Sequence, residues 1–391
     1  MRKIVYFVGA GLPKSLELPQ RPIPVMYDFV SVLADYLSHD VILIFLARLE
    51  QMDPYPYEWK SPRAKELSKR LLGNAPDRSP ENLEGFKRAL KNRPFESIES
   101  LLETVQSRGD NEGVIRFGYA INRLFSEIIG WEVNWDPLEA FISRQFRLPE
   151  TFHTFISFNY DLLLERAVEK LTSGDWEVSR GYGFTVNYGI MDDFLDLSSV
   201  KAIDLPASGT SPRRIEILKP HGSLNWLVPL KTPYPTDSTG MRFENGPVIV
   251  PVTSEVELRY SRFTPKFNRL DLPGTCLSLD VLPCIVPPVS RKSSSLPFFE
   301  EVRKREQEAI KNADEIYVLG WSAPKTDQDQ ESLILDAVAN RSKSDPAVTV
   351  VNQDATPEYF ERVANLCGVD KGKLKIFNAG FNDFVAEVCQ V

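Results

Sequence analysis

Five short polar or glycine-containing segments each follow an apolar run, and they carry the residues best suited to chemistry. They are GAG (9–11), NYD (159–161), HGS (221–223), GWS (320–322) and NQD (352–354). The side chain of Asn159 can position a water molecule with one donor and one acceptor group, and it does not titrate. The imidazole of His221 can take a proton from water or a hydroxyl group near neutral pH. These residue types suit a reaction in which water is oriented and deprotonated.

The GAG segment ends an apolar run as the first loop of a dinucleotide-binding domain does. Glycines in such a loop let the backbone approach a pyrophosphate, and the N-terminus of the next helix directs free N–H groups at it. Here Lys14 stands where the third glycine of the fingerprint belongs, and Pro13 opens a series of prolines that postpones a helix. The acidic residue expected about 20 residues later is also missing. The ordinary dehydrogenase interpretation therefore fails, and GAG alone is typical of a phosphate loop or of a plain tight exit from a strand.

The later polar segments also have structural interpretations. Asn159 and Asp161 are typical helix-capping residues, and a solitary histidine is often a core residue with one satisfied nitrogen. His39 lies in a helical pattern and His153 lies near the start of a strand, which leaves His221 as the histidine on a strand-end loop. The ordered set of GAG, NYD, HGS and GWS is far less expected by chance than any one of its members. The set therefore favours a shared site.

Six short apolar runs, rich in β-branched residues, recur at long intervals. They are residues 4–8, 154–158, 214–218, 315–319, 347–351 and 374–377. Runs that are apolar on both faces and separated by helical patterns indicate a parallel sheet covered on two sides. We therefore expect an α/β fold class, a doubly wound Rossmann-like parallel sheet. Because the carboxyl ends of the strands line one crevice in such a sheet, the polar segments should face a shared cavity.

The long stretch between the first two apolar runs has a different texture. Apolar residues repeat at helical spacing within 26–37, 95–105 and 114–128. We therefore expect a large helical insertion at about 25–150, after the first strand, and a nucleotide-binding domain made of 1–24 and 151–391. Within that domain, about 229–300 is rich in proline and serine and is expected to form long loops with a few short strands, not a separate core.

Composition and charge limit the classes of partner. The chain of 391 residues contains 42% hydrophobic residues, enough for a large core, and its formal net charge is −8. Lys and Arg are scattered, so we expect no direct contact with nucleic acid. The four cysteines form no CxxC pair and no zinc-site spacing, which predicts no metal site and a reducing compartment. Because apolar windows are short, we expect a cytoplasmic protein without a membrane segment or a signal peptide.

The ordered motifs resemble those of the sirtuin-like superfamily, and more closely its NAD-hydrolysing branch from bacterial antiphage defence than the protein deacylases. The resemblance covers about 1–24 and 151–391, and its best matches are FNYDLLLE, KPHGSLNW and LGWSAPKTD. The segment FESIESLLETV (95–105) also resembles a helix that those hydrolases carry in their insertion. Deacylases support their cleft with a zinc ribbon of two CxxC pairs, which this chain lacks, so a deacylase ranks below the other interpretations.

The resemblance implies an NAD glycohydrolase that takes NAD as substrate, uses no metal, and releases nicotinamide and ADP-ribose. By resemblance, Asn159 would hold the nicotinamide ribose and the attacking water, and His221 would act as general base or polarise a ribose hydroxyl. Asp161 would support that arrangement. The further binding residues that the resemblance implies are Gly9, Ala10 and Gly11 at the phosphates, Gly320 and Ser322 at phosphate or ribose, and Asn352 at the adenosine ribose.

The GAG loop departs from the pattern of that family in two places. Pro13 replaces a serine, which removes a possible phosphate donor, and Glu17 replaces a later glycine. A carboxylate that points inward repels a pyrophosphate. Ser15 is the candidate substitute for the lost hydroxyl. Lys14 or Arg21 is the candidate source of a positive charge that compensates Glu17. These departures keep open an alternative, a catalytically weak module that senses NAD, ADP-ribose or a cyclic relative.

An unregulated NAD hydrolase would be toxic, so we expect restraint. The chain begins on its first strand and ends soon after its last. Control is therefore expected through self-association into a homo-oligomer or through a regulatory protein, in an antiphage or stress system. The helical insertion and the proline-rich segment are the expected contact surfaces.

Overall fold

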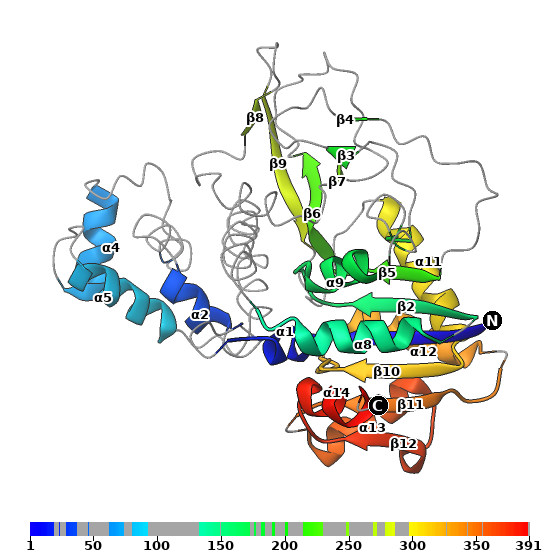
Figure 1. The fold of residues 1–391 in the computed structure, drawn as a ribbon. Coiled ribbons are helices and arrows are strands. Elements are labelled where there is room, and N and C mark those ends of the chain that lie inside the picture. Colours follow the sequence, from blue (N-terminus) through cyan, green and yellow to red (C-terminus); the bar gives the residue numbers. More distant parts are fainter. Residues whose placement is uncertain are drawn as a thin grey trace. The chain divides into compact units, whose positions relative to one another are not determined.

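The computed structural model is drawn in Figure 1, whose element labels are kept below. The residues that the structure describes are 1–18, 23, 29–36, 46, 62–73, 80–92, 133–148, 150–172, 176, 181–183, 190–191, 200–201, 214–229, 248–249, 269–271, 278–285, 297–325, 327–341, 343–353 and 355–389. The chain divides into two compact units, the first made of Met1–Ile23 and Ser126–Val391 and the second of Pro24–Phe125. Each unit is described by itself.

A six-stranded parallel sheet forms the centre of the first unit. Its strands are β1 (Arg2–Val8), β2 (Thr151–Ser157), β5 (Ile215–Leu218), β10 (Glu315–Leu319), β11 (Ala347–Val351) and β12 (Leu374–Phe377). They lie in the order β12-β11-β10-β1-β2-β5, and every neighbouring pair is parallel. Counted along the chain, this is the 3-2-1-4-5-6 order of a doubly wound Rossmann-like sheet. The expected α/β fold class is confirmed, and each strand coincides with one predicted apolar run apart from its end residues.

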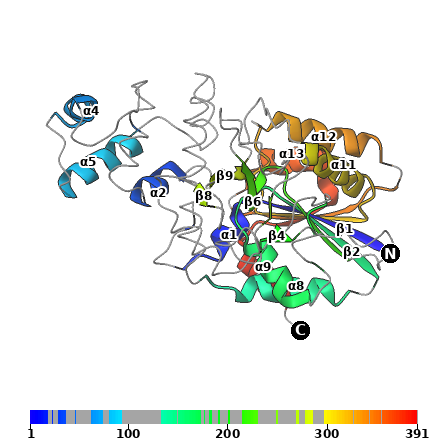
Figure 2. The ribbon, with the colours of Figure 1, turned by 90° about the horizontal axis from the view of Figure 1, so that it is seen from above.

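Helices cover both faces of this sheet, as Figure 2 shows. One face carries α8 (Asp136–Phe146), α9 (Leu163–Thr172) and α14 (Phe381–Cys389), with the short α1 (Gly11–Ser15) against α14. The other face carries α11 (Pro297–Lys311), α12 (Gln328–Ala339) and α13 (Pro357–Cys367), which is followed by the 3-10 turn η4 (Lys371–Lys373). Within the described ranges, none of the helices has the length and apolar character needed to cross a membrane.

The two helical layers bury the central strand completely, which explains its unbroken apolar sequence. Residues 4–8 of β1 are each exposed by at most 1%, and full burial of such side chains stabilises the fold by about 1.5–3 kcal/mol each. Tyr6 is the polar member of the run. Its hydroxyl lies 2.9 Å from Nδ1 of His153 and donates to Oε1 of Gln145 at 3.1 Å. His153 is therefore a core residue that satisfies a buried tyrosine.

The second unit contains α2 (Phe29–Tyr36), α4 (Pro62–Leu72) and α5 (Pro80–Lys91). An exposed ion pair joins α5 to α2, with Nζ of Lys91 at 2.6 Å from Oδ1 of Asp35. The helix predicted within 26–37 is observed as α2, whereas the helical patterns at 95–105 and 114–128 lie outside the described residues. The predicted range of the insertion, 25–150, also includes α8, which packs in the first unit. The insertion itself stays a prediction.

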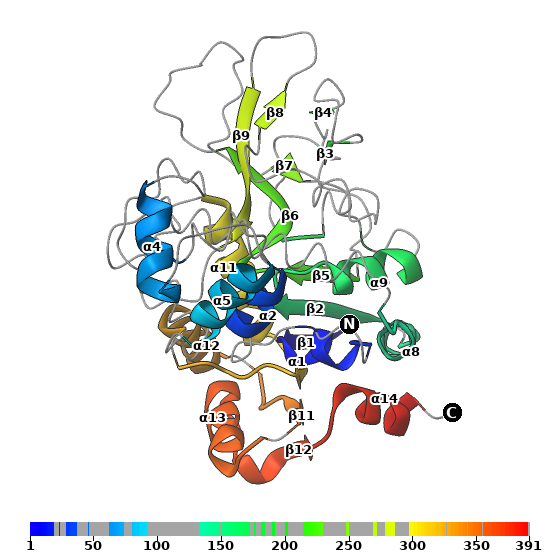
Figure 3. The same cartoon turned by 90° about the vertical axis from the view of Figure 1, so that its left-hand side faces the viewer.

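The first unit also contains a second sheet, whose strand β6 (Gly222–Pro229) is the strand that follows β5 in the chain. Its longest strands, β6 and β9 (Ser278–Ile285), pair antiparallel and lie side by side in Figure 3. The shorter strands are β3 (Ile190–Met191), β4 (Val200–Lys201), β7 (Val248–Ile249) and β8 (Arg269–Asp271), and the order is β4-β3-β7-β6-β9-β8. The sequence predicts a few short strands in the proline-rich segment, and β7, β8 and β9 are the strands described there.

The chain leaves β1 and β10 in opposite directions, toward β2 and toward β11. This reversal is the topological switch point, where open α/β sheets bind their ligands. The two loops that follow these strands touch each other, because Gly11 N–H donates to the carbonyl of Gly320 at 2.9 Å. A Cβ atom on Gly9 would lie 2.4 Å from Cα of Trp321. One on Gly11 would lie 2.8 Å from Cα of Gly320, which itself has a φ of +60°. Glycine is therefore required at these positions by the contact between the loops.

Gly11→Ala is expected to lower the free energy of unfolding by about 1–3 kcal/mol or more, because the added methyl group meets backbone atoms that cannot rotate away. Gly380→Ala is the matched control, since a Cβ atom there meets nothing nearer than 3.5 Å. We expect the control to change stability by less than about 1 kcal/mol. Urea unfolding followed by tryptophan fluorescence measures both variants. Equal stability of Gly11→Ala and the wild type would show that the two loops are not in contact.

Candidate functional site

Asn159 lies where β2 passes into the loop before α9. The backbone N–H of Phe158 donates to the carbonyl of Val8 at 2.9 Å and so extends the pairing of β1 and β2 by one residue. The side chain of Asn159 then turns to the first loop, where its Nδ2 donates to the carbonyl of Gly9 at 3.1 Å. The predicted amide thus contacts the GAG loop at the switch point, although 150 positions separate the two residues in the chain.

His221 follows β5 in a tight turn. Gly222 N–H donates to the carbonyl of Lys219 at 3.0 Å, and the φ of +81° at Gly222 directs the chain into β6. The imidazole is only 3% exposed, and its Nε2 lies 2.7 Å from Oδ2 of the buried Asp327. A carboxylate at this distance holds the ring in one orientation and determines which nitrogen carries the proton.

Asp327 is the functional residue that sequence reasoning misses. It stands at the N-cap of α12, where an aspartate side chain ordinarily accepts a hydrogen bond from the first N–H groups of the helix. Here it makes no such capping bond, and its Oδ2 faces His221 instead. The available signal is the acidic residue that ends the motif LGWSAPKTD, but its ordinary interpretation is a helix cap.

Aromatic rings join the strand ends that carry these polar groups. The ring of Phe158 stacks on that of Trp321, with centroids 4.7 Å apart and 12° between the planes. The ring of Phe158 also lies 5.5 Å from that of His221, and the ring of Tyr160 lies 6.5 Å from it. The residues on both sides of Asn159 therefore approach His221, so the amide and the imidazole lie in one neighbourhood at the carboxyl edge of the sheet.

The predicted phosphate-binding residues lie at the same edge of the sheet and differ in their exposure to solvent. The N–H groups of Gly9 and Gly11 donate to carbonyls of β10 and its loop, at 3.1 and 2.9 Å, and so serve the fold. Ala10 is partly exposed and forms the N-cap of α1. Ser322 is exposed, two residues after Gly320. The structure brings these five residues together, and their contact with phosphate or ribose stays a prediction.

Glu17, one of the two departures of the GAG loop, and Ser15, a candidate substitute for the lost hydroxyl, both have partners within the first unit. Oε2 of Glu17 accepts from Ile23 N–H at 2.9 Å and lies 2.9 Å from Nζ of Lys14. The hydroxyl of Ser15 donates to a carbonyl within α1 at 2.6 Å. The negative charge of Glu17 is therefore compensated locally, and the Ser15 hydroxyl is engaged in its own helix. Arg21, the other candidate for a compensating charge, lies outside the described residues.

Asn352 follows β11 immediately and is partly exposed. Its side chain is hydrogen-bonded to the hydroxyl of Tyr359, and that hydroxyl donates to the carbonyl of Trp321 at 2.6 Å. Burial raises the pKa of Tyr359 well above its usual value, so the hydroxyl stays protonated and able to donate. Asn352 is thus connected through Tyr359 to the loop after β10, while its contact with a ribose stays a prediction.

Asp161 is buried and opens α9. Its Oδ1 accepts from the N–H of Leu163 at 3.0 Å, and its backbone carbonyl accepts from Nζ of Lys219. Burial raises the pKa of the Asp161 carboxyl to about 6, against the lowering effect of the Lys219 ammonium and with a smaller raising effect of Glu165. The helix-capping interpretation thus accounts for its observed contacts, and its support of the site is indirect, through Lys219.

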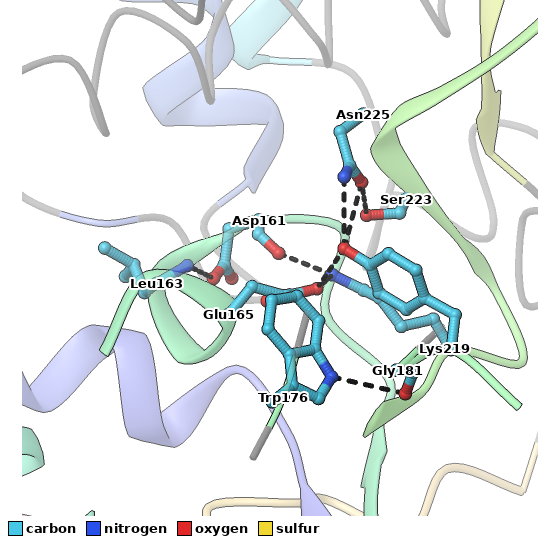
Figure 4. A network of polar contacts seen from close by, with 9 residues as sticks. Asp161, Leu163, Glu165, Trp176, Gly181, Lys219, Ser223 and Asn225 are labelled. Atoms are coloured by element: carbon cyan, nitrogen blue, oxygen red, sulfur yellow. Dashed lines mark hydrogen bonds and ion pairs between the residues drawn. The ribbon is translucent and has the colours of Figure 1, made fainter. Parts of the chain in front are cut away.

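A buried ionic network anchors the turn that carries His221 (Figure 4). Nζ of Lys219, which is fully buried, lies 2.7 Å from Oε1 of Glu165 on α9. The hydroxyl of Tyr182 donates to the same carboxylate oxygen at 3.4 Å and accepts from Nδ2 of Asn225 at 3.1 Å. Removing one partner of a buried ion pair leaves an uncompensated charge and costs about 3–5 kcal/mol. The network therefore fixes Lys219, and with it the start of the turn.

Metal-binding side chains are not grouped in the part of the chain that the structure describes. No cluster of three or more His, Cys, Asp or Glu side chains there could hold a metal ion. The thiol of Cys367 is buried, and burial raises its pKa to about 12. That thiol is therefore protonated at neutral pH and is a poor nucleophile.

Asp161→Asn is expected to stabilise the protein at about pH 7.5, because asparagine keeps the oxygen that caps α9 and removes a buried carboxylate. The pKa of Asp161 is about 6 in the native protein and about 3.9 in an unfolded chain. The native carboxyl thus binds more protons, so wild-type stability falls as the pH rises from about 4 to about 6. Across this window the advantage of the variant should grow by about 2–3 kcal/mol and then level off.

Urea unfolding of the wild type and Asp161→Asn at several pH values measures this difference. Asp161→Ala removes the cap as well and should be less stable than Asp161→Asn by about 1 kcal/mol at every pH. A gap between the wild type and Asp161→Asn that is independent of pH would contradict the burial of this carboxylate.

The chain is similar to solved Sir2 structures, but no family model and no curated protein matches it. A mutant Sir2 homologue in complex with ADP-ribose is 14% identical with a TM-score of 0.40, and the match covers 99% of this chain and 90% of that chain. Another Sir2 enzyme is 14% identical with a TM-score of 0.38, covering 99% and 91%. Sir2 with an inhibitor, 2′-O-acetyl-ADP-ribose and a deacetylated peptide is 13% identical with a TM-score of 0.37, covering 99% and 92%. A likeness at this identity and score carries no conclusion about activity.

Proposed function

We propose that the protein is an NAD hydrolase that releases nicotinamide and ADP-ribose at the carboxyl edge of the first sheet. One observation carries the proposal. Beside the switch point, the Asn159 amide is bonded to the Gly9 carbonyl, and the buried pair of His221 and Asp327 lies in the same neighbourhood. Rossmann-like sheets bind dinucleotides across such a switch point. The residue types at this edge suit the orientation and deprotonation of a water molecule.

Hydrolysis of NAD breaks the bond between C1′ of the nicotinamide ribose and the pyridinium nitrogen. Both bonding electrons go to the nitrogen, so nicotinamide leaves as a neutral molecule, and the ribose passes through an oxocarbenium-like state as in other glycoside hydrolyses. The oxygen of water joins C1′, and one proton of that water must be removed. The protein has to orient the water and accept the proton, and it needs no strong nucleophile.

The pair of His221 and Asp327 gives that proton transfer a direction. An ionised Asp327 accepts a hydrogen bond, so Nε2 of the neutral imidazole carries the proton. Nδ1 then holds the lone pair and serves as the base. Once it has taken the proton, the imidazolium is stabilised by the neighbouring carboxylate. General-base assistance of this kind accelerates a reaction by about 10²–10⁴-fold.

Asn159 orients the attacking water in this proposal. Its bond to the carbonyl of Gly9 fixes the plane of the amide, and Oδ1 is the atom that accepts a hydrogen bond from the water. Asn352, Ser322 and the GAG loop are the proposed contacts of the remainder of the dinucleotide.

The environment of Glu17 is compatible with a pyrophosphate at the GAG loop, which the hydrolase proposal requires. The sensing alternative is kept open by two departures in the GAG loop, the hydroxyl lost at Pro13 and the repulsion that a carboxylate at position 17 would exert on a pyrophosphate. The ion pair with Lys14 and the bond to Ile23 N–H compensate that charge. The charge of Glu17 therefore does not by itself weaken phosphate binding by this loop, whereas the hydroxyl lost at Pro13 still distinguishes it from the family pattern.

The site proposal predicts the effect of three substitutions on nicotinamide release from NAD. His221→Ala should lower the rate by about 10²–10⁴-fold, because the base is lost. Asn159→Ala should lower it by about 10²-fold, because the water is no longer oriented. Asp327→Asn keeps the shape of the side chain but not its charge, and should also lower the rate by about 10²-fold. Chromatography of released nicotinamide measures each rate.

Matched controls carry the same residue types at the opposite edge of the sheet. Asn312 bonds the carbonyl of Glu308 before β10, and Asp345 pairs with Lys373 before β11. Asn312→Ala and Asp345→Asn should leave the rate unchanged. If the wild type releases no nicotinamide in any oligomeric state, the hydrolase proposal is wrong, and ADP-ribose binding by calorimetry then tests the sensing alternative.

We further propose that self-association or a regulatory protein restrains this activity, in an antiphage or stress response. None of the site residues named above belongs to the second compact unit or to the proline-rich segment at about 229–300, and these two parts of the chain are the proposed contact surfaces. Light scattering of the purified protein with and without NAD should show a change of assembly that accompanies turnover. A protein that stays monomeric and is always active would contradict this regulation.

A further inference from the structure

We infer that Arg362 and Tyr359, on one face of α13, are positioning residues that hold the turn between β10 and α12 and thereby place Asp327 beside His221. The turn is made of residues 320–325 and ends at Asp327. The inference rests on the proposed function for the catalytic roles of His221 and Asp327.

Arg362 binds both the turn and α12. Its Nε donates to the carbonyl of Ala323 at 2.7 Å, and its Nη2 donates to the carbonyl of Pro324 at 3.4 Å. The same guanidinium forms a two-pronged contact with Glu331, at 3.1 Å from Oε1 and 2.9 Å from Oε2. A planar guanidinium with fixed donor directions can serve these acceptors at once, and a lysine ammonium cannot.

These contacts lie on both sides of Asp327 in the chain. Asp327 N–H donates to the carbonyl of Pro324 at 3.4 Å, and Glu331 N–H donates to the carbonyl of Asp327 at 2.9 Å. Arg362 therefore binds Pro324 and Glu331, the two residues to which the backbone of Asp327 is hydrogen-bonded. Because the Asp327 side chain makes no capping bond in α12, the position of that residue depends on how the turn is held.

The turn has a conformation that needs external support. Ala323 has a φ of +48°, a left-handed conformation that costs a residue with a Cβ atom about 1–2 kcal/mol. Two carbonyls on either side of Ser322 are held from α13, that of Trp321 by the hydroxyl of Tyr359 at 2.6 Å and that of Ala323 by Arg362. Strained residues persist only when their surroundings fix them.

The helix that supplies these groups is itself well anchored. The Thr356 hydroxyl caps α13 by accepting from Tyr359 N–H at 3.3 Å, and Gly368 ends it in the left-handed conformation with a φ of +66°. The face opposite to solvent buries apolar side chains, including Phe360 and Val363. Positions 359 and 362 have the i, i+3 spacing and so lie on one face of the helix. A fixed helix can therefore set the position of the turn.

The test compares the ring signals of His221 in protein whose histidines are labelled with ¹⁵N. The chain has three histidines, so His221→Gln identifies the signal. Arg362→Ala should shift the His221 ring signals in the direction that Asp327→Asn shifts them. It should also lower kcat for NAD hydrolysis by about 10-fold with a smaller effect on KM, because the base is displaced while substrate contacts remain. Tyr359→Phe loses the bonds of its hydroxyl to the Trp321 carbonyl and to the Asn352 side chain but keeps the contacts of Arg362, and it should give a smaller shift in the same direction.

Arg341→Ala is the matched control. The Arg341 guanidinium donates to the carbonyl of Cys367 at 3.0 Å and so joins the end of α12 to the end of α13, away from the turn. Its loss should leave the His221 signals and kcat at wild-type values. A folded Arg362→Ala variant with wild-type His221 signals would overturn the inference, whatever its activity. If that variant does not fold, Arg362→Lys and Glu331→Gln decide by the same signals. A wild type that does not hydrolyse NAD defeats the proposed function, and the signals still decide the positioning.

Discussion

The backbone contact between the loops after β1 and β10 is the constraint on which the carboxyl edge of the sheet depends. At the switch point the two halves of the sheet continue in opposite directions, and Gly11 N–H bonded to the carbonyl of Gly320 joins them. The same loops place the carbonyl of Gly9 within reach of Asn159 and Trp321 against Phe158. A side chain at any of the three glycines would separate the loops, so the amide and the aromatic rings would lose their common support.

Two buried polar contacts then fix the turn that carries His221, an ion pair and a hydrogen bond. Lys219 pairs with Glu165 at its start, and His221 pairs with Asp327 at its end. Burial of the charged groups in both contacts has a desolvation cost, which their hydrogen bonds and, for Lys219 and Glu165, the opposite charge offset only when the geometry is held. The first pair joins residues 219–221 to α9, and the second pair joins the same segment to the start of α12. Such an arrangement adds little net stability, but it restrains the position of the His221 imidazole from both ends of the turn.

Much of the fold could be predicted from the sequence, because strands buried on both faces are apolar throughout and each such run is local. The placement of the candidate residues was partly predictable for the same reason: Asn159, His221 and Asn352 lie within three residues of the ends of strands, and parallel topology brings strand ends together. Asp327 and Arg362 could not be found this way. Their partners lie 106 positions from Asp327, and 31 to 39 positions from Arg362, and no local pattern announces a contact across such separations. A few short strands are expected in the proline-rich segment and β7, β8 and β9 lie there, but no local pattern predicts their pairing with β6 in a second sheet.

Asp161 and Asp327 show why the residue type alone does not decide a role. Both are aspartates at the start of a helix, and local propensity predicts a cap for each. Asp161 does cap α9, because the nearby cation, Lys219, is bonded to the backbone carbonyl of Asp161 and to Glu165. Asp327 does not cap α12, because the imidazole of His221 competes for its carboxylate. A capping bond contributes about 1 kcal/mol, whereas a buried hydrogen bond to a charged group contributes about 1.5–3 kcal/mol. The bond between Asp327 and His221 is therefore favoured over a capping bond in α12. Because the Asp327 carboxylate does not cap the helix, it is available to the imidazole.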